Sequence, residues 1–514
     1  MERVVFLCRL DELPDGRSRG FDPLRSGQDT VLVVRRGREL HAWRDDCPHQ
    51  PGTAMAWRKD AYLNRDGSRI VCHSHGARFD LATGVCTLGP CLGQALTRVP
   101  VLLDSGDRVY AVLDEKASSD ASCFNFAGEG AHPETQETAR MTRVNKVLIV
   151  GGGIGGLSLA SGLRNRGIGV DLVEVKKEWT VYGVGIIQQC NVIRAMAQLG
   201  LVDRFLDAGF AYENVGLYSA EGELMRMLPG VRAAGPEYPA NLGISRLALH
   251  KVLSSTAAER GTTIRLGLTV EHLEQDADGV DVMFTDGTRG WYDLVVGADG
   301  LFSKVRSMVF GKELKPRFTG QAVFRHNFPR APEIDHLAAF YGKNHNAGLC
   351  PLSKDLMYLF VTSSEPGNPW MPEDRLADLM RERLAEFGGI VGRLREQISD
   401  PKQVVYKPME VIFVPEPWYR GRVVLIGDAV HATTPHLGQG AGMAVEDAVV
   451  LSELLAEDAP VEALLSRFMQ RRYERCKFIV ENSIQIGDWE MQGASHADRA
   501  EVVKKMMEVT AQPL

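Results

Sequence analysis

A run of glycines after a short apolar segment constrains the fold of this chain most. Residues 146–150 are mainly apolar, as in a buried parallel strand, and residues 151–156 follow with the pattern G-x-G-x-x-G before a helical stretch. Glycines here let the backbone approach a pyrophosphate at the helix N-terminus. The pattern predicts the opening of a doubly wound α/β domain, although a tight βα turn that binds nothing also fits it. The residues expected at a cofactor are Gly151, Gly153, Ile154, Gly155 and Gly156.

An acidic residue strengthens the prediction of a dinucleotide site. Glu174 lies near the end of the next expected strand, residues 170–175, about twenty residues after the glycines. A carboxylate at that place can accept hydrogen bonds from ribose hydroxyls. The alternative is a surface glutamate beside a tight turn. The two features together favour a bound dinucleotide.

Two later segments indicate which dinucleotide is bound. Residues 293–300 read DLVVGADG, and residues 422–431 read RVVLIGDAVH, followed by Pro435 and by GQGAG at residues 438–442. With the glycine turn they stand in the order of the three fingerprints of class A flavoprotein aromatic hydroxylases. The chain resembles that family from residue 145 to about residue 485. The resemblance implies FAD as the bound cofactor and NAD(P)H as the reductant, received without a separate Rossmann domain.

The resemblance also implies roles for single residues. Asp428 would accept hydrogen bonds from the ribityl hydroxyls of FAD, and the helix beginning near Gly438 would direct N–H groups at the pyrimidine edge, where reduced flavin is negative. Asp299 and Gly300 would lie on the FAD side that also receives NAD(P)H. Arg246 would reach the cofactor, the alternative being a solvated helix charge. The cofactor residues implied beyond the glycine turn are Glu174, Arg246, Asp299, Gly300, Asp428, Gly438 and Gly440.

A second constellation lies near the N-terminus. Cys47-Pro48-His49 is followed by Cys72-His73-Ser74-His75, so each of two loops supplies one cysteine and one histidine. Two thiolates and two imidazoles are the ligands that distinguish a Rieske [2Fe–2S] centre from an all-cysteine cluster. A structural zinc site is the alternative, but zinc fingers usually pair Cys with Cys and His with His.

The surrounding residues resemble the Rieske family. Residues 76–84 read GARFDLATG after the second loop, and Gly89-Pro90 closes the next turn. By this resemblance Cys47 and Cys72 hold one iron, and His49 and His75 hold the other. Cys86 and Cys91 lie outside the ligand pattern and are interpreted as ordinary thiols.

These motifs predict a multidomain chain. Short β-rich runs with turns predict an all-β Rieske domain over residues 1–115, and a Ser-, Ala-, Gly- and Glu-rich stretch predicts a linker over residues 116–142. Residues 143–514 are expected to form an α/β, Rossmann-like, three-layer FAD-binding domain. This domain would carry a substrate sheet within about residues 205–290 and 312–415, and C-terminal helices over residues 440–514.

Composition excludes several classes of protein. With 514 residues and a net charge of −7, the chain has no broad basic field for nucleic acid or anionic lipid. Its longest run without charge or histidine, residues 147–163, is shorter than the roughly 20 residues that span a bilayer. Charged residues at 9, 11 and 12 argue against a signal peptide. We therefore expect a cytoplasmic protein without nucleic-acid or membrane partners.

The expected activity is monooxygenation of a small aromatic or heteroaromatic ring. By the resemblance, NAD(P)H reduces FAD, O₂ adds to give a C4a-hydroperoxide, and one oxygen atom passes to the ring. The pocket should lie between the flavin and the second sheet. The catalytic base is not identified: Pro435 and His326 are candidate catalytic residues, and His431 and His436 are bases by type only. The residues expected to contact substrate are Gln321, His326, Tyr341 and Tyr358.

The Rieske domain keeps an alternative function open. Class A hydroxylases complete their cycle without an iron–sulfur cluster, so the sequence does not explain its presence. The cluster either relays single electrons to or from the flavin or is a structural or oxygen-sensing appendage. In the alternative function, flavin and cluster would pass electrons to a redox partner protein that is itself the oxygenase. A redox-sensing regulator lacks support, because no DNA-binding module or basic stripe is visible.

Overall fold

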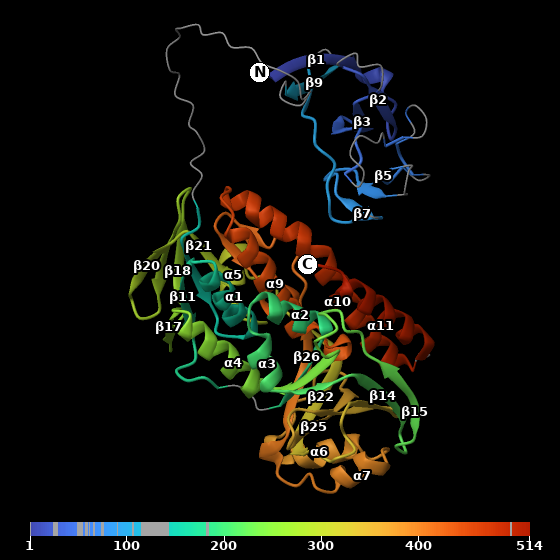
Figure 1. Ribbon diagram of the computed structural model, residues 1–514, viewed down its shortest axis with the longest axis vertical. Helices are drawn as coiled ribbons and strands as arrows, with labels where there is room; N and C mark the ends of the chain where they lie inside the picture. The colour runs from blue at the N-terminus through green and yellow to red at the C-terminus, as the bar shows by residue number, and fades with distance from the viewer. Residues whose placement is uncertain are drawn as a thin grey trace. The chain divides into compact units, whose positions relative to one another are not determined.

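The computed structural model describes residues 2–23, 29–48, 55–56, 60, 62–64, 67–72, 77–89, 91–104, 107–114, 143–180, 184–493 and 496–514 (Figure 1). The chain divides into two compact units, Met1–Gln136 and Glu137–Leu514. The expected linker lies outside the described residues. No helix within the described ranges is long and apolar enough to cross a membrane.

The N-terminal unit is built from antiparallel β-strands. Tight turns join its hairpins; for example, Gly37 joins β3 to β4 with a φ of +61°. Two apolar clusters fill its interior, and one of them contains Cys47 and Cys72. The sheets, in strand order, are β1 (Glu2–Arg9), β9 (Arg108–Asp114), β8 (Val101–Leu103); β2 (Ser18–Phe21), β3 (Val31–Arg36), β4 (Glu39–Arg44); and β5 (Arg69–Val71), β6 (Arg78–Asp80), β7 (Cys86–Leu88).

A mainly parallel sheet forms the centre of the second unit. Its order is β17 (Thr263–Leu266), β11 (Gly169–Glu174), β10 (Lys146–Val150), β21 (Leu294–Gly297), β28 (Val423–Leu425) and β27 (Tyr419–Arg420), of which only β27 is antiparallel to its neighbour. Strands β10, β21 and β28 are buried along nearly their whole length because layers cover both faces. Because β10, β21 and β28 run parallel, their carboxyl ends meet at one edge of the sheet.

Helices and small sheets surround this centre. Strands β18 (Val270–Gln275), β19 (Val280–Phe284) and β20 (Arg289–Tyr292) share its apolar core, as do α1 and α9. A further small sheet joins β12 (Gly185–Gln189), β16 (Asn241–Ser245) and β13 (Phe210–Tyr212). The helices are α1 (Ile154–Asn165), α2 (Cys190–Gln198), α3 (Val202–Asp207), α4 (Arg246–Glu259), α5 (Lys304–Phe310), α8 (Asp428–His431), α9 (Gly440–Leu455), α10 (Val461–Gln492) and α11 (His496–Ala511), with a 3-10 turn η5 (Pro435–Leu437).

The second sheet of this unit, called the large sheet, is mostly antiparallel. Its order is β15 (Leu224–Pro229), β14 (Asn214–Ser219), β23 (Leu337–Tyr341), β24 (Asn346–Pro351), β25 (Leu356–Ser364), β22 (Arg317–Pro329) and β26 (Val405–Val411). Helices α6 (Leu376–Arg383) and α7 (Gly389–Arg395) cover one of its faces and share an apolar cluster with it (Figure 1). An all-β unit followed by an α/β unit with a second sheet confirms the predicted fold class.

Candidate active site

The glycine turn after β10 brings three segments into close contact. Gly151 has a φ of +114°, and a Cβ on it would lie 2.3 Å from the carbonyl oxygen of Ala298. A Cβ on Gly156 would lie 2.1 Å from the carbonyl oxygen of Gly151. Only glycine permits these approaches. In contrast, nothing lies within 4 Å of a Cβ built on Gly153, which leaves open space at the N-terminus of α1.

Glu174 borders this turn from the end of β11. Its carboxylate accepts hydrogen bonds from the backbone N–H groups of Gly152 at 2.9 Å and Lys176 at 3.0 Å. An ionised carboxylate offers about four acceptor sites, so about two remain for hydroxyl groups of a ligand. The ring of Trp179 lies against Gly152 and contacts the ring of His250 with centroids 4.7 Å apart.

Asp299 follows β21 at the same edge of the sheet, but its side chain is engaged within its own loop. It accepts hydrogen bonds from the Ser303 hydroxyl at 2.5 Å and from the N–H groups of Lys304 at 2.7 Å and Val305 at 3.0 Å. These bonds close the first turn of α5. Contact with a ligand at this position is therefore left to the backbone, including Gly300, around which a Cβ would meet open space.

Asp428 follows β28 and is the acidic group left free at this edge. In the described part of the chain its carboxylate forms no hydrogen bond or ion pair, and the residue is exposed. Burial raises the pKa of this carboxyl, because protein surrounds the open space that it faces, while His431 and Arg246 act in the opposite direction. A ligand that donates hydroxyl groups would satisfy this carboxylate.

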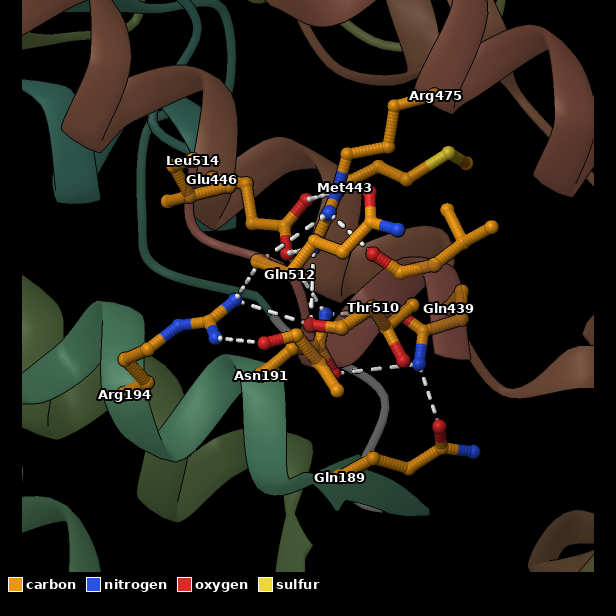
Figure 2. Close-up of polar contacts among 12 residues, drawn as sticks. Gln189, Asn191, Arg194, Gln439, Met443, Glu446, Arg475, Thr510, Gln512 and Leu514 are labelled. Atoms are coloured by element: carbon orange, nitrogen blue, oxygen red, sulfur yellow. Dashed lines mark hydrogen bonds and ion pairs between the residues drawn. The ribbon is translucent and has the colours of Figure 1, made fainter. Parts of the chain in front are cut away.

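A second turn leads into α9. Pro435 is exposed, and Gly438 adopts a left-handed conformation with a φ of +66°. Gln439, the residue before α9, exchanges amide hydrogen bonds with Asn191 at 2.9 and 3.2 Å (Figure 2). The start of α9 is thereby tied to α2. Its first N–H groups have no side-chain cap, so they are free to point at a ligand.

The register of the large sheet decides which side chains leave its uncovered face. Residues directly opposite each other on antiparallel strands project from the same face. On β22, Val323, Arg325 and Asn327 lie opposite three residues of β25, namely Thr362, Phe360 and Tyr358. On their other side, these β25 residues lie opposite Asn346, Gly348 and Cys350 of β24. Asn346 in turn lies opposite Tyr341 of β23. Gln321, opposite Ser364, belongs to the same row. Three of the four expected substrate residues thus share one face: Gln321, Tyr341 and Tyr358.

His326 projects from the other face. It lies opposite Leu359, which belongs to the apolar cluster under α6 and α7, and its ring contacts Phe328 with centroids 4.4 Å apart. Burial lowers the pKa of His326, so the neutral ring is favoured. The sheet separates His326 from Tyr358 and Gln321, and we do not retain it as a candidate for substrate contact or catalysis.

Elements of the parallel-sheet layer approach the uncovered face of the large sheet. A Cβ on Gly185 of β12 would lie 2.2 Å from the ring of Tyr358. A Cβ on Gly487 of α10 would lie 2.6 Å from Gln321 and 2.9 Å from His436. Because these positions are glycine, β12 and α10 can approach this face of the sheet closely. His436 of η5, which follows Pro435, lies beside the same face.

Arg325 carries a charge on the uncovered face. Within residues 143–180, 184–493 and 496–514, its guanidinium has no hydrogen-bond or ion-pair partner. Burial and the nearby Arg246 lower its pKa to about 10, while Tyr358 acts in the opposite direction, so the group stays charged at neutral pH. Arg246 lies near enough to both Arg325 and Asp428 to lower the pKa of each.

His436 connects this space with a polar cavity. Its Nδ1 lies 2.9 Å from the Thr434 hydroxyl, and its Nε2 lies 3.2 Å from a carboxylate oxygen of Glu490. Gln321 donates a long hydrogen bond, 3.4 Å, to the same carboxylate. Glu490 and Gln321 also line a polar cavity of about 130 Å³. Glu490 therefore connects His436 and the large sheet with this polar cavity.

Comparison with known proteins decides the family. Residues 145–483 match the FAD binding domain family, and residues 3–103 match the Rieske [2Fe-2S] domain family. The chain belongs to the FAD-dependent monooxygenases of the aromatic-hydroxylase type. This confirms the family, the FAD and the Rieske domain that the motifs predicted.

The matches to this monooxygenase cover nearly the whole length of its relatives. It is 34% identical over 352 residues to a 2-heptyl-3-hydroxy-4(1H)-quinolone synthase of Pseudomonas aeruginosa, a match that covers 67% of this chain and 90% of that protein. It is 32% identical over 350 residues to an FAD-dependent urate hydroxylase of Klebsiella oxytoca, covering 65% and 88%. A Klebsiella pneumoniae protein crystallised with FAD and uric acid matches with a TM-score of 0.65 and 27% identity, over 72% of this chain and 97% of that one.

The residues of the monooxygenase unit fit FAD. Open space at Gly153 would accommodate a pyrophosphate, the Asp428 carboxylate would accept hydroxyl groups, and the uncapped start of α9 would offer N–H donors. These sites lie at carboxyl ends of neighbouring parallel strands or beside them. The residue-level contacts remain our proposal.

The cysteines of the Rieske unit fit an iron–sulfur cluster. Cys47 and Cys72 are 1% and 0% exposed and belong to one apolar cluster. His49 and His75 lie outside the described residues. The structure adds a contact that spacing did not reveal: the Cys91 thiol hydrogen-bonds with Cys86 and with Cys47, and burial raises its pKa to about 12, which keeps it protonated.

Among the described residues, one group has the composition of a metal site, and it is already satisfied. His431, Asp447 and Cys476 converge within the core. Arg472 donates to Asp447 at 2.8 Å and to the Cys476 sulfur at 3.3 Å, so a cation fills that place. His431 is completely buried and bonds Asp447 at 2.6 Å. His431 therefore holds Asp447 within the core.

Sequence reasoning missed Arg325 and Glu490. A signal for Arg325 existed, because it interrupts an otherwise buried strand, where a charge is rare unless it has a partner or a ligand. Glu490 carried no signal, since it lies 54 positions after His436 on a long helix and only the fold brings them together.

Proposed function

We propose that this monooxygenase hydroxylates a small aromatic or heteroaromatic acid, with NAD(P)H as the reductant and O₂ as the oxygen source. The observation that carries the proposal is Arg325, a charged group on the uncovered face of the large sheet without a partner in the described ranges. An enclosed charge without a partner costs free energy. A substrate carboxylate or ring oxyanion would remove that cost and accept two hydrogen bonds from the planar guanidinium.

The relatives support the ring class. Urate and a heptyl-hydroxyquinolone are nitrogen heteroaromatics, and the structure crystallised with uric acid has the same fold over most of its length. Tyr358, Tyr341 and Gln321 offer aromatic and amide groups beside Arg325. They would hold the plane of a ring and orient its polar substituents.

The residues of this chain would hold and shield the reacting groups. Bound FAD supplies activation of O₂ and transfer of one oxygen atom. Asp428 would accept from its ribityl hydroxyls, the N–H groups at the start of α9 would face its pyrimidine edge, and Pro435 would lie against its ring. The apolar cluster of Tyr212, Cys350, Leu352 and Tyr358 would exclude water from one side of the pocket.

His436 and Glu490 would manage the proton of the substrate. Removing a proton from a ring hydroxyl or ring N–H makes the ring more electron-rich, which favours attack on electrophilic oxygen. His436 is adjacent to Pro435, and its Nε2 lies 3.2 Å from Glu490, which lines the polar cavity. This pair therefore offers a route by which a proton leaves the pocket toward that cavity.

A substrate panel tests the proposal. Small hydroxylated aromatic and heteroaromatic acids would be compared with their neutral methyl esters or amides, measuring substrate-stimulated NAD(P)H oxidation and hydroxylated product. We expect the acids to give stoichiometric product and the neutral forms to be poor substrates. Equal turnover of acids and esters would contradict the assignment of Arg325. Stoichiometric product without any added protein would reject the alternative of an electron-transfer protein that serves a separate oxygenase.

We also propose that the Rieske cluster relays single electrons to or from the flavin. The variant Cys72→Ser removes one iron ligand and should abolish the cluster while FAD stays bound. A matched control is Cys8→Ser, which changes a buried cysteine of the same unit in a different apolar cluster. Slower hydroxylation in the first variant alone is expected. Unchanged NAD(P)H-dependent hydroxylation after cluster loss would contradict the relay.

A further inference from the structure

Two neighbouring residues of α9 each hold one of the turns that face the flavin. The Asp447 carboxylate accepts a hydrogen bond from the N–H of Gly427 at 3.0 Å, next to Asp428. The Glu446 carboxylate accepts one from Asn191 at 2.9 Å, and Asn191 in turn bonds Gln439 at the start of α9 (Figure 2). Asp447 thus supports the ribityl side, and Glu446 supports the pyrimidine side.

Arg472 of α10 joins these two carboxylates. It donates to Asp447 at 2.8 Å through Nε and to Glu446 at 2.8 Å through Nη1, and its Nη2 reaches the carbonyl oxygen of Met443 at 3.1 Å. The side chains of Glu446, Asp447 and Arg472 are 0% exposed. We call these three residues the carboxylate bracket. No other residue in the described chain bonds both carboxylates.

Neighbouring arginines complete the surroundings of the bracket. Arg475 donates to Glu446 at 2.9 and 2.7 Å, and both Arg475 and Arg194 donate to backbone carbonyls at the end of α11 (Figure 2). Burial opposes the charged forms of both carboxylates, but Arg472 and Arg475 lower the pKa of Glu446 to about 2, and His431 and Arg472 lower the pKa of Asp447 to about 2. The carboxylates of the bracket are therefore ionised at neutral pH.

A buried set of charges is an expensive way to stabilise a core. Apolar side chains of similar volume often give equal or greater stability, so the retained charges point to a requirement for geometry. The planar guanidinium offers donors in a rigid fork and can bond two carboxylates in fixed directions, which a lysine ammonium does not match. The requirement here is the spacing between two backbone turns.

We propose that Arg472 is a positioning residue for FAD: by joining Glu446 and Asp447, it fixes the Gly427–Asp428 turn relative to the Gln439–Gly440 turn, and so sets the affinity and the reduction potential of the bound flavin. The proposal rests on the placement of FAD given under the proposed function. The two carboxylates of the bracket have different roles. Asp447 controls the turn that carries the ribityl acceptor and hence affinity, and Glu446 controls the helix N-terminus at the pyrimidine edge and hence potential.

The full-length variant Arg472→Lys tests the proposal. It keeps the charge but not the fork, and we expect FAD to bind about tenfold more weakly, because charged hydrogen bonds are lost on both sides. The reduction potential and the visible spectrum of the bound flavin should also shift. The matched control is Arg471→Lys, since Arg471 pairs with Glu453 across the same two helices at 2.9 Å but contacts neither turn. The control should keep the wild-type affinity and potential.

Separate variants distinguish positioning from general stability. Asp447→Asn should weaken FAD binding more than it shifts the potential, and Glu446→Gln should do the reverse. If these variants and Arg472→Lys lower only the melting temperature, while FAD affinity and potential stay at the wild-type values, the proposal is overturned. Should Arg472→Lys not fold, the two single-carboxylate variants carry the test with the same readouts.

The placement of FAD has its own control. Asp428→Asn changes a group that touches the cofactor directly in the proposed arrangement and does not touch the bracket. If Asp428→Asn binds FAD as the wild type does, the placement itself fails. If Asp428→Asn loses FAD while the bracket variants keep the wild-type affinity and potential, only the inference about Arg472 fails.

Discussion

The charges packed in the core beside α9 and the charges near the proposed pocket differ in whether they have partners. In the core, Glu446, Asp447 and Arg472 are saturated with hydrogen bonds. Near the proposed pocket, Asp428 and Arg325 have no hydrogen-bond or ion-pair partner in the described residues. Paired charges here hold backbone, whereas we propose that the unpaired ones bind ligands. Substituting one paired and one unpaired charge tests this difference.

The largest effect on stability is expected from Asp447→Asn. Removing the Asp447 charge takes away the carboxylate that His431 bonds and one of the two carboxylates that Arg472 joins. This loss should lower the free energy of unfolding by about 3 kcal/mol at pH 7. The folded-state pKa of Asp447, about 2, lies below the unfolded value of about 3.9. Its contribution is therefore present above pH ~4 and lost as pH falls toward ~2. Urea denaturation against pH would contradict this if the difference from wild type stayed constant.

Asp428→Ala should have the largest effect on the cofactor. Loss of a charged acceptor should weaken FAD binding by about 100-fold, or about 2.7 kcal/mol. The apoprotein should be no less stable, because the carboxylate has no partner there to lose. Ultrafiltration of the flavin and the melting temperature of the apoprotein measure the two quantities. A less stable apoprotein would show that Asp428 also holds the fold.

Arg325→Met should affect the substrate and leave the cofactor unchanged. We expect KM for an acidic substrate to rise about 30-fold, or about 2 kcal/mol, because the ion pair is lost. KM for the neutral ester should not change, and the FAD content should stay the same. Arg325→Lys should fall between the two, since it keeps the charge without the fork. Equal losses for acid and ester would mean that Arg325 supports the pocket only by packing.

The smallest effect is expected from His326→Gln. His326 lies under α6 and α7, on the face opposite Tyr358, so kcat/KM should change by less than about twofold, while the melting temperature falls slightly. Tyr358→Phe is the matched comparison on the uncovered face and should raise KM. A large loss of kcat in His326→Gln, with FAD content unchanged, would contradict the separation of the two faces.

Much of the site could be read from residues close together in the chain. The glycine turn and Asp428 each follow a buried strand, and Cys47 and Cys72 stand in short loops with their neighbouring histidines. Such features need only local geometry, since a strand end, a tight turn and a helix start put them at one place. Family membership and both cofactor domains were predictable for that reason.

Which side chains share a pocket could not be read in the same way. Strand β22 is buried on both faces over residues 321–324, so it lacks the alternation that would separate Arg325 from His326. Only pairing with β25 assigns each residue to a face. Asp447 and Arg472 are 25 positions apart on different helices, and nothing in either helix marks them as partners.

The order of the domains and the two cofactors follow from the amino-acid sequence, because each depends on a few consecutive residues with restricted backbone or ligand chemistry. The tertiary structure alone decided which charges are paired in the core and which are left facing the pocket. The reason is physical: the free energy of a charge depends on its distance to other groups and on its exclusion from water, and both are set by packing between distant segments.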